Sequence, residues 1–370
     1  MARRQKGSES EDAMLDVNKK HRDMDALAEY RRGLLKKPQL RNLFLELTLR
    51  CNERCIHCGS SCGDVQSEEL TVPEYERLLR EVREDLGTGG KMLCITGGEP
   101  LLRREFFEIT EIAHSLGFSW GMTSNGTLIT PEVAKDLARV GMKTISVSID
   151  GLPETHDKFR RTPGGFDKAM RGIENLLDVG GWKALQVTTV VTHENISQLD
   201  ELFTLFDKLD IDSWRVINIE PIGRAKQHPE LLLTPEDYRT MFEFIRSKRM
   251  AGQPVCYGCS HYLGDEYERE VRDWYFLCTA GLYTASIMAN GDITACLDIE
   301  RRPEFIQGNI RRDRFSKVWL DRFEVFRRDL SDTTELCRGC PEAVYCRGDA
   351  FHSYDFDARR PEVCFRNILF

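Results

Sequence analysis

A regular alternation of short apolar runs with amphipathic segments restricts the fold of this chain more than any other feature of its sequence. Six runs predict strands, at residues 43–48, 92–96, 119–123, 144–149, 185–191 and 214–219. Helical spacing of apolar residues follows these runs, at residues 68–90, 106–116, 131–140, 166–179, 199–209 and 235–250. Strands that alternate with helices of this length form a parallel sheet with right-handed crossovers. Six units are too few for an eight-stranded barrel, so we expect an α/β fold that falls short of a complete barrel.

Three cysteines follow the first predicted strand at short spacing. Cys51, Cys55 and Cys58 form a C-x3-C-x2-C loop directly after that strand. Three thiolates this close together can bind one metal centre, and a four-iron cluster held by them would keep one iron free of protein ligands. An open coordination position is typical of a reactive metal site. Zinc is the alternative, with His57 or Cys62 as its fourth ligand.

A second motif, Gly97-Gly98-Glu99-Pro100, ends the predicted strand at residues 92–96. A glycine pair at a strand end lets the backbone approach a ligand closely. By itself the motif is equally compatible with an ordinary strand-to-helix turn. In parallel α/β barrels the chemistry lies at the carboxyl ends of the strands, where both this motif and the cysteine loop fall.

The cysteine loop resembles the signature of the radical S-adenosylmethionine (SAM) enzymes, with His57 in the aromatic position before the last cysteine and the GGEP motif about 40 residues further on. The resemblance implies a partial (β/α)6 TIM-like barrel. It also implies that Cys51, Cys55 and Cys58 hold a [4Fe–4S] cluster whose open iron binds SAM. One electron then cleaves SAM to a 5′-deoxyadenosyl radical, which abstracts a hydrogen atom from the substrate.

The same resemblance implies further SAM-binding residues. His57 belongs to the cofactor loop, and Gly97, Gly98 and Glu99 take the place of the residues that contact the SAM amino group. Ser148 and Arg160 stand at the twelve-residue separation of two SAM contacts in the sulfatase-maturing branch of the family. Considered alone, Ser148 is a strand-end hydroxyl and Arg160 is a solvated surface charge.

The last third of the chain is rich in cysteine. Its eight cysteines are Cys256, Cys259, Cys278, Cys296, Cys337, Cys340, Cys346 and Cys364. Eight thiols match the ligand requirement of two further four-iron clusters. Asn290-Gly291-Asp292 predicts a hairpin turn between strands at residues 283–288 and 293–296. The pattern resembles the SPASM extension of radical SAM enzymes, which holds two auxiliary clusters.

The resemblance implies how these cysteines divide between the two clusters. The second auxiliary cluster is assigned Cys337, Cys340, Cys346 and Cys364. The first is assigned Cys278 and Cys296, together with Cys256 and Cys259. The sequence departs from the family at Ala350, where a cysteine would ligate the first cluster. Either Cys256 or Cys259 fills that gap, or the first cluster keeps an open iron. A zinc ribbon built from Cys337, Cys340, Cys256 and Cys259 is the alternative.

A catalytic acid or base is expected beside the predicted hairpin. In the sulfatase-maturing branch an aspartate directly follows the hairpin cysteine, whereas here Leu297 follows Cys296 and Asp298 comes one residue later. A shift of one residue along a strand turns a side chain to the other face of the sheet. Asp298 is therefore either the catalytic residue or a surface carboxylate.

Thirteen cysteines are many for a chain of 370 residues whose basic start is not followed by the apolar core of a signal peptide. The cytosol keeps thiols reduced, so metal binding is favoured over disulfides and a cytoplasmic location is expected. The net charge of −8 and a pI of about 5.7 favour binding neither to nucleic acid nor to an anionic membrane. The sequence contains no run of 18 apolar residues, so no transmembrane helix is expected.

We expect three parts in the chain. Residues 1–38 form an N-terminal extension, disordered at residues 8–12 and helical from about residue 13 to residue 36. Residues 39–250 form the radical SAM core, and residues 251–370 form the SPASM domain.

The leading functional expectation is a radical SAM enzyme with SAM and three [4Fe–4S] clusters. It oxidatively modifies a ribosomally synthesised peptide or protein, for example by a side-chain crosslink, and takes electrons from a flavodoxin or ferredoxin. One alternative is a radical SAM enzyme that acts on a small molecule such as a haem precursor or an alcohol. Another is a non-catalytic iron–sulfur or zinc scaffold, which would have no use for a SAM-binding motif.

Overall fold

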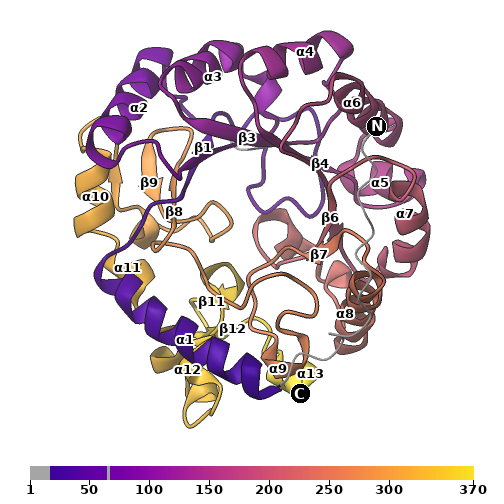
Figure 1. The fold of residues 1–370 in the computed structure, drawn as a ribbon, viewed down its shortest axis with the longest axis vertical. Helices are drawn as coiled ribbons and strands as arrows, with labels where there is room; N and C mark the ends of the chain where they lie inside the picture. Colours follow the sequence, from indigo (N-terminus) through magenta and orange to yellow (C-terminus); the bar gives the residue numbers. More distant parts are fainter. Residues whose placement is uncertain (1–16, 65–66) are drawn as a thin grey trace.

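Parallel strands in chain order form the centre of the computed structural model, which describes residues 17–64 and 67–370; the disorder expected at residues 8–12 lies outside this part. The strands are β1 (Asn42–Glu46), β2 (Met92–Thr96), β3 (Ser119–Ser124), β4 (Thr144–Ser148), β5 (Ala184–Val191) and β6 (Ser213–Asn218). Their outer face is covered by α2 (Val72–Leu86), α3 (Phe106–Ser115), α4 (Pro131–Arg139), α5 (Pro153–Arg160), α6 (Gly165–Val179), α7 (Leu199–Phe206) and α8 (Pro235–Met250), as Figure 1 shows. The predicted α/β partial barrel is confirmed.

The strands bury one face against the helices and turn the other face towards the barrel interior. In β5 every second residue is buried, which is the alternation expected when only one face of a strand is fully covered. Several interior side chains are polar. The hydroxyl oxygens of Ser146 and Thr188 lie 2.6 Å apart, and Gln186 donates to the Ser213 hydroxyl at 2.7 Å. The interior therefore differs from the apolar layers that fill a complete TIM barrel.

The C-terminal part extends the same sheet at both edges. Strand β7 (Val255–Tyr257) pairs in parallel with β6, and β8 (Thr284–Ile287) pairs in parallel with β1. Strands β9 (Asp292–Thr294) and β10 (Gly308–Asn309) continue beyond β8 as antiparallel neighbours. The hairpin turn predicted at residues 290–292 is confirmed. The domain boundary predicted after residue 250 stays a prediction, and the sheet continues across it.

Helix α1 (Val17–Lys36) lies along the cysteine-rich part of the chain, beside α9 (Gly264–Tyr267) and α12 (Ala343–Cys346) in Figure 1. Lys20 Nζ forms an ion pair with Glu270 at 2.7 Å, and Met24 is buried against Tyr262 and Phe276. The helix predicted in the N-terminal extension thus packs on the cysteine-rich part of the chain.

In the barrel, helices α2 and α5 differ from the sequence-based expectation in ways that bear on the site. Helix α2 begins at Val72 rather than next to Ser67, because Thr71 and Glu74 form a capping box at that point. Helix α5 was not expected, since its eight mostly polar residues carry no clear apolar stripe. It ends at Arg160, whose position depends on this helix.

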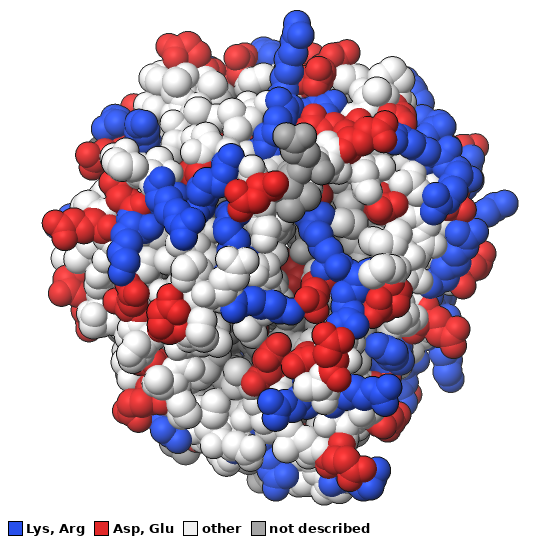
Figure 2. Space-filling model, turned by 180° about the vertical axis from the view of Figure 1, so that it is seen from behind, with Lys and Arg blue, Asp and Glu red and all other residues white. Residues whose placement is uncertain are grey.

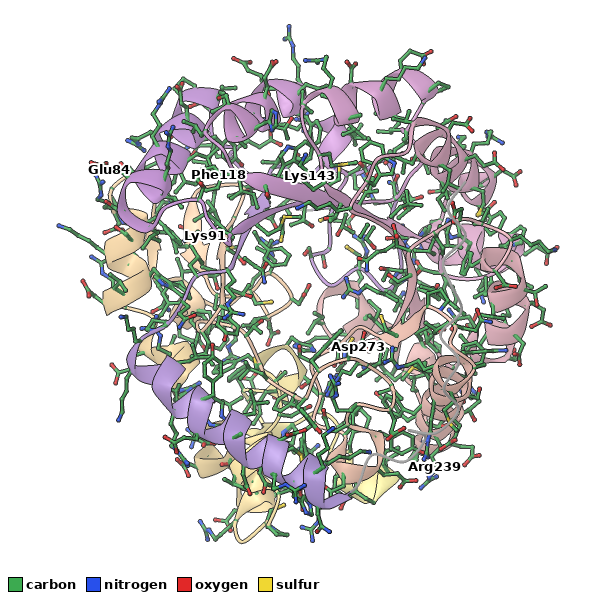
Figure 3. The ribbon with its side chains drawn as sticks, viewed as in Figure 1. Glu84, Lys91, Phe118, Lys143, Arg239 and Asp273 are labelled. Carbon is green, nitrogen blue, oxygen red and sulfur yellow. The ribbon has the colours of Figure 1, made fainter. Side chains whose placement is uncertain are left out.

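The site residues lie at the carboxyl edge of the sheet. Lys91, Phe118 and Lys143 directly precede β2, β3 and β4, so their labels in Figure 3 mark the opposite, amino-terminal edge. Acidic and basic side chains are interleaved over the face seen in Figure 2. Among the described residues, no helix combines the length and the apolar character that a membrane span requires.

Candidate active site

The cysteine loop leaves the carboxyl end of β1 and is held on one side by the buried side chain of Arg160. Its guanidinium donates to Glu53, within the loop, at 2.8 Å and to Asp150, after β4, at 2.7 Å. His57 Nε2 lies 3.1 Å from the same Asp150 oxygen. Burial raises the pKa of Asp150, but the neighbouring charges of Arg160 and His57 lower it by more than burial raises it. The pKa of this carboxyl therefore lies well below its usual range. The loop is thus tied to β4 and α5 by a buried network of opposite charges.

Arg224 holds the loop from the other side. It lies in the short helix η3 (Gly223–Gln227), and its residue is only 7% exposed. Its side chain donates to the carbonyl oxygens of Cys55 at 2.8 Å and Cys62 at 3.0 Å, and its backbone amide donates to that of Cys58 at 3.0 Å. These bonds engage the backbone and not the thiols. The loop backbone is therefore held by protein contacts that leave the thiols available to a metal.

The thiols of the loop differ in their surroundings. Burial raises the pKa of Cys51 to about 11 and that of Cys55 still further. A hydrogen bond from the Cys62 thiol lowers the pKa of Cys58 to about 5 despite burial. Metal binding by Cys51 and Cys55 must therefore displace their protons. Cys62, one of the alternative zinc ligands, is buried directly beside Cys58.

The glycine pair after β2 packs against the start of the cysteine loop. A Cβ added at Gly97 would lie 2.4 Å from the Thr48 carbonyl oxygen, and one added at Gly98 would lie 2.1 Å from that of Arg50. Gly97 also has a φ of +152°, which side chains rarely adopt. Only glycine therefore allows this close approach of the two strand ends.

The Glu99 side chain supports the turn from inside. Its carboxylate accepts hydrogen bonds from the Ser124 hydroxyl at 3.0 Å and from the backbone amides of Asn125 at 2.9 Å and Leu101 at 3.2 Å. Burial raises the pKa of Glu99 to about 7. Any contact of this motif with SAM is thus expected from its backbone, and the assignment of Gly97, Gly98 and Glu99 to SAM stays a prediction.

One cavity of about 520 Å³ brings half of the predicted site residues together. On the barrel side it is lined by Cys55, His57, Cys58, Ser148 and Arg160. From the C-terminal part, Cys259, Cys278, Cys296 and Asp298 line the same cavity. Cys51 lies at a neighbouring cavity of about 470 Å³ on the other face of the loop. The cavity therefore joins residues from three predicted roles: metal binding, SAM binding and acid–base catalysis.

Cys256 is placed differently from Cys259. It lies within β7 opposite Arg215 of β6, and it does not line the 520 Å³ cavity. Cys259 follows the end of β7 and lies on the cavity wall. The structure thus brings Cys259, but not Cys256, to the same wall as Cys278 and Cys296.

The remaining four cysteines gather at a separate place. The thiol of Cys337 is electrostatically coupled to those of Cys340, Cys346 and Cys364, and Cys340 is coupled to Cys364. Arg366 donates to the Cys340 sulfur at 3.4 Å. The grouping is the one expected for a second auxiliary cluster, although its ligands stay a prediction.

Asp298 faces the cavity despite its shift by one residue. Strand β9 ends at Thr294, so the two-residue alternation of side chains does not continue to residue 298. The Asp298 carboxylate lies 3.8 Å from the Cys296 sulfur, whereas Leu297 lines a different pocket. The position is compatible with an acid–base role.

A charged cluster on the cavity wall was not expected from the sequence. His261 is buried between Asp349 and Glu220, at 2.6 Å and 2.7 Å. Burial lowers the pKa of His261, but the two carboxylates raise it to about 10, well above its ordinary value. His352 lies against this group, with its Nε2 4.0 Å from Glu220. No local sequence signal marks these residues, because they come from three segments.

Polar atoms beside the cysteine loop lack partners in the described structure. Glu53 Oε1 and His57 Nδ1 are both buried, and neither has a hydrogen-bond partner there. Such groups are costly unless a ligand or water satisfies them. Together with three thiols in one fixed loop, they fit a bound cluster and its organic ligand.

Comparisons with known proteins agree with this geometry. The model of the radical SAM superfamily matches residues 45–206, and the model of the SPASM iron–sulfur cluster-binding domain matches residues 278–341. AdoMet-dependent heme synthase from Methanosarcina barkeri is 30% identical, over 84% of this chain and 90% of that protein. Mycofactocin maturase MftC from Mycolicibacterium smegmatis is 32% identical, over 82% of this chain and 76% of that protein.

A solved structure shows the same fold. Streptococcus suis SuiB bound to SAM has a TM-score of 0.70 at 18% identity, and the match covers 90% of this chain and 77% of SuiB. SuiB bound to its precursor peptide SuiA has a TM-score of 0.68 at the same identity, covering 90% and 76%. The domain matches imply SAM and iron–sulfur clusters as cofactors, which favours iron over zinc at these cysteines. The chain belongs to the radical SAM superfamily and carries a C-terminal SPASM domain.

Proposed function

We propose that this enzyme uses radical SAM chemistry to modify a ribosomally synthesised peptide or protein oxidatively. The observation that carries the proposal is the 520 Å³ cavity, which has the cysteine loop on one side and three cysteines of the SPASM domain on another. A substrate held there is within reach of both metal-binding regions. A scaffold that only carries electrons needs no such cavity.

Three [4Fe–4S] clusters are proposed, and the assignment follows the grouping of thiols. Cys51, Cys55 and Cys58 would hold the SAM-binding cluster. Cys259, Cys278 and Cys296 would hold the first auxiliary cluster, and Cys337, Cys340, Cys346 and Cys364 the second. When bound, the SAM-binding cluster and SAM would supply a 5′-deoxyadenosyl radical that removes a hydrogen atom from the substrate.

The chain's own residues prepare this chemistry. Arg160 and Arg224 fix the loop, Ser148 and His57 line the cofactor side of the cavity, and Asp298 is the group we propose to accept the substrate proton. A flavodoxin or ferredoxin in the cytoplasm is the proposed electron source.

A peptide substrate is supported by one relative and by one fold neighbour. The mycofactocin maturase is 32% identical, and SuiB has been solved with a precursor peptide. The second candidate is a haem precursor, because the heme synthase relative is 30% identical over 90% of its own length. The chain is almost equally similar to both relatives, so sequence identity does not distinguish the two candidate substrates. Only a measurement of which substrate is converted distinguishes them.

The test is a turnover experiment with the reconstituted enzyme, SAM and dithionite. One arm contains a short peptide encoded beside the gene, and the other contains an iron porphyrin with carboxylate side chains. A change in peptide mass that depends on SAM supports the peptide. Conversion of the porphyrin, with the peptide unchanged, would overturn it in favour of the second candidate.

A further inference from the structure

We propose that His352 is the fourth protein ligand of the first auxiliary iron–sulfur cluster, in place of the cysteine that the family has where Ala350 stands here. The inference rests on the proposed function, because it requires that Cys259, Cys278 and Cys296 bind a cluster. It assigns a metal-binding role to a residue that the cysteine pattern alone does not reveal.

Ala350 leaves a gap in the ligand set without moving the backbone away. The residue is fully buried, in contact with Met24, Tyr262 and Phe276. Cys278 packs against the same cluster of buried side chains that contains Ala350. The segment therefore still passes beside a cluster thiol, although residue 350 itself has no ligand atom.

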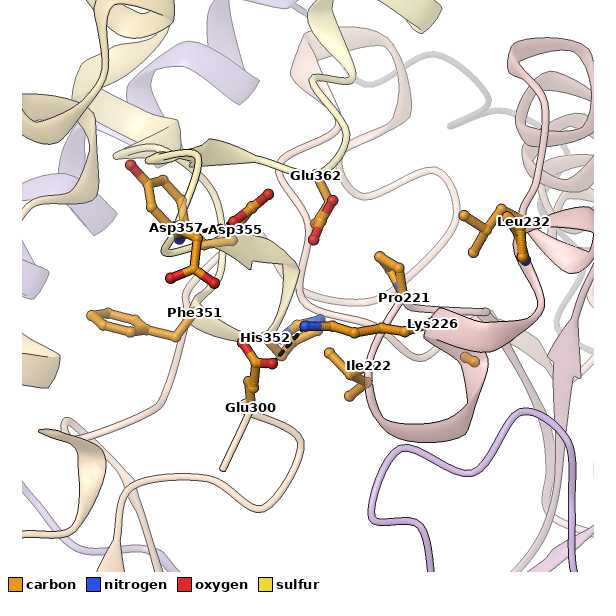
Figure 4. Close-up of a pocket in the computed structure, with 13 residues that line it drawn as sticks. Pro221, Ile222, Lys226, Leu232, Glu300, Phe351, His352, Asp355, Asp357 and Glu362 are labelled. Carbon is orange, nitrogen blue, oxygen red and sulfur yellow. Dashed lines mark hydrogen bonds and ion pairs between the residues drawn. The ribbon is translucent and has the colours of Figure 1, made fainter. Parts of the chain in front are cut away.

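The His352 ring lies on the cavity wall that also carries the three thiols. Its side chain is 15% exposed, and it packs edge-on against His261, with ring centroids 5.3 Å apart. The ring also borders a second cavity of about 340 Å³, where Figure 4 shows it beside the ion pair of Lys226 and Glu300. His352 thus lies between the 520 Å³ cavity and the 340 Å³ cavity, and its ring borders both.

Glu220 places a carboxylate near the His352 ring, although beyond hydrogen-bond distance. Its carboxylate lies 4.0 Å from His352 Nε2 and is itself fixed by His261 at 2.7 Å. Histidine ligands typically direct one ring nitrogen to a carboxylate and the other to the metal. Imidazole is a known replacement for cysteine on iron–sulfur clusters, where it raises the reduction potential.

Two other residues compete for the same role. Asp298 lies 3.8 Å from the Cys296 sulfur, but its carboxylate oxygen is a harder ligand than imidazole and suits a cluster iron less well. Cys256 offers a soft thiolate, but it lies in β7 and does not line the cavity. Of these three residues, only His352 combines a suitable ligand atom with a place on the cavity wall.

The experiment uses the full chain with Cys51, Cys55 and Cys58 replaced by alanine, so that only the auxiliary clusters remain. The protein is reconstituted with iron and sulfide after labelling its histidines with ¹⁵N. Iron content, reduction potentials and nitrogen hyperfine couplings from pulsed electron paramagnetic resonance are measured. His352→Cys and His352→Leu are compared with Asp298→Asn as the matched control.

We expect a histidine nitrogen coupling in the parent and in Asp298→Asn. His352→Cys should lose this coupling, keep its iron and show a lower potential for one cluster, because a thiolate replaces a neutral ring. His352→Leu should lose the coupling, and added 2-mercaptoethanol should shift its spectrum.

Two results would overturn the proposal in distinguishable ways. Two auxiliary clusters without a nitrogen coupling, or with one that survives in His352→Leu, remove His352 from the ligand set and leave the proposed function intact. Iron for one auxiliary cluster only, already in the parent, removes the first auxiliary cluster and with it both proposals.

Discussion

Two cysteine-rich regions of the molecule, the loop at residues 51–58 and the segment at residues 331–347, are held in place in different ways. The loop that carries Cys51, Cys55 and Cys58 is fixed by two buried arginines, Arg160 and Arg224, from separate elements. In the segment at residues 331–347, which carries three of the cysteines proposed for the second auxiliary cluster, no residue is buried. Its links to the rest of the protein include hydrogen bonds from Arg31 to the carbonyl oxygens of residues 344 and 345.

This difference implies that a bound metal has a different effect on the structure of each region. A preformed site pays its ordering cost during folding, so the metal adds reactivity but little structure. An exposed segment without a core gains its order from the metal, as small metal-binding domains do. We therefore expect the loop of Cys51, Cys55 and Cys58 to keep its conformation through contacts with the rest of the protein. We expect residues 331–347 to become ordered only when their metal binds.

The largest expected effect comes from removing the three loop thiols. Replacing Cys51, Cys55 and Cys58 by alanine should abolish SAM cleavage, because no other site is proposed to bind SAM. Iron content should fall from about twelve to about eight per chain. The measurements are 5′-deoxyadenosine formation under dithionite and iron analysis. Continued formation of 5′-deoxyadenosine in the triple variant would show that the assignment is wrong.

Removing all clusters should affect the two regions unequally. After anaerobic chelation, backbone amides in residues 331–347 should lose protection from hydrogen exchange, because this segment buries none of its own residues. The amides of Arg54 and Ile56 in the cysteine loop should stay protected, because they donate to the backbone carbonyl oxygens of Arg160 and Phe159 in α5. Hydrogen exchange with mass spectrometry gives both values in one experiment. Equal loss in both regions would contradict the comparison.

The sequence predicts the regular part of this fold well and the supports of the site poorly. Strands β1 to β6 lie within two residues of the predicted runs, because each buries one face and so carries a periodic signal. The bonds of Arg224 to Cys55 and Cys62 join segments about 160 residues apart, and nothing local records them. The predicted strand alternation at Asp298 also fails, because the strand ends earlier.

Removing the cation from the buried charge network beside the Cys51–Cys58 loop should destabilise the folded protein. Arg160→Leu leaves Glu53 and Asp150 buried without their cation, which should lower the free energy of unfolding by about 3–5 kcal/mol. Urea unfolding of the cluster-free protein measures this loss. As the matched control, Lys158→Leu on the same helix removes only an exposed ion pair with Glu194 and should cost about 1 kcal/mol or less. Equal losses in both variants would contradict the structural role of Arg160.

The charged cluster around His261 should make stability depend on pH. The folded pKa of about 10 lies above the ordinary 6.5, so the folded state holds this proton more tightly than the unfolded state. The stabilisation is complete below pH 6.5 and is lost as the pH rises towards 10. His261→Gln should remove this slope from urea unfolding measured between pH 6.5 and 10. The control His193→Gln, at an exposed histidine, should keep it.

The smallest expected effect separates two neighbouring cysteines in the C-terminal part. Cys256 lies within β7 at the position paired with Arg215 of the adjacent strand, whereas Cys259 lies on the cavity wall with Cys278 and Cys296. Cys256→Ala should therefore leave iron content and the paramagnetic resonance spectrum unchanged. Cys259→Ala should shed one cluster, or about four irons per chain, because only two thiols then remain on that wall. Both variants are measured in the background without the three loop cysteines, so that the SAM-binding cluster does not contribute. Loss of iron in Cys256→Ala with retention in Cys259→Ala would reverse the assignment and would require β7 to rearrange when the cluster binds.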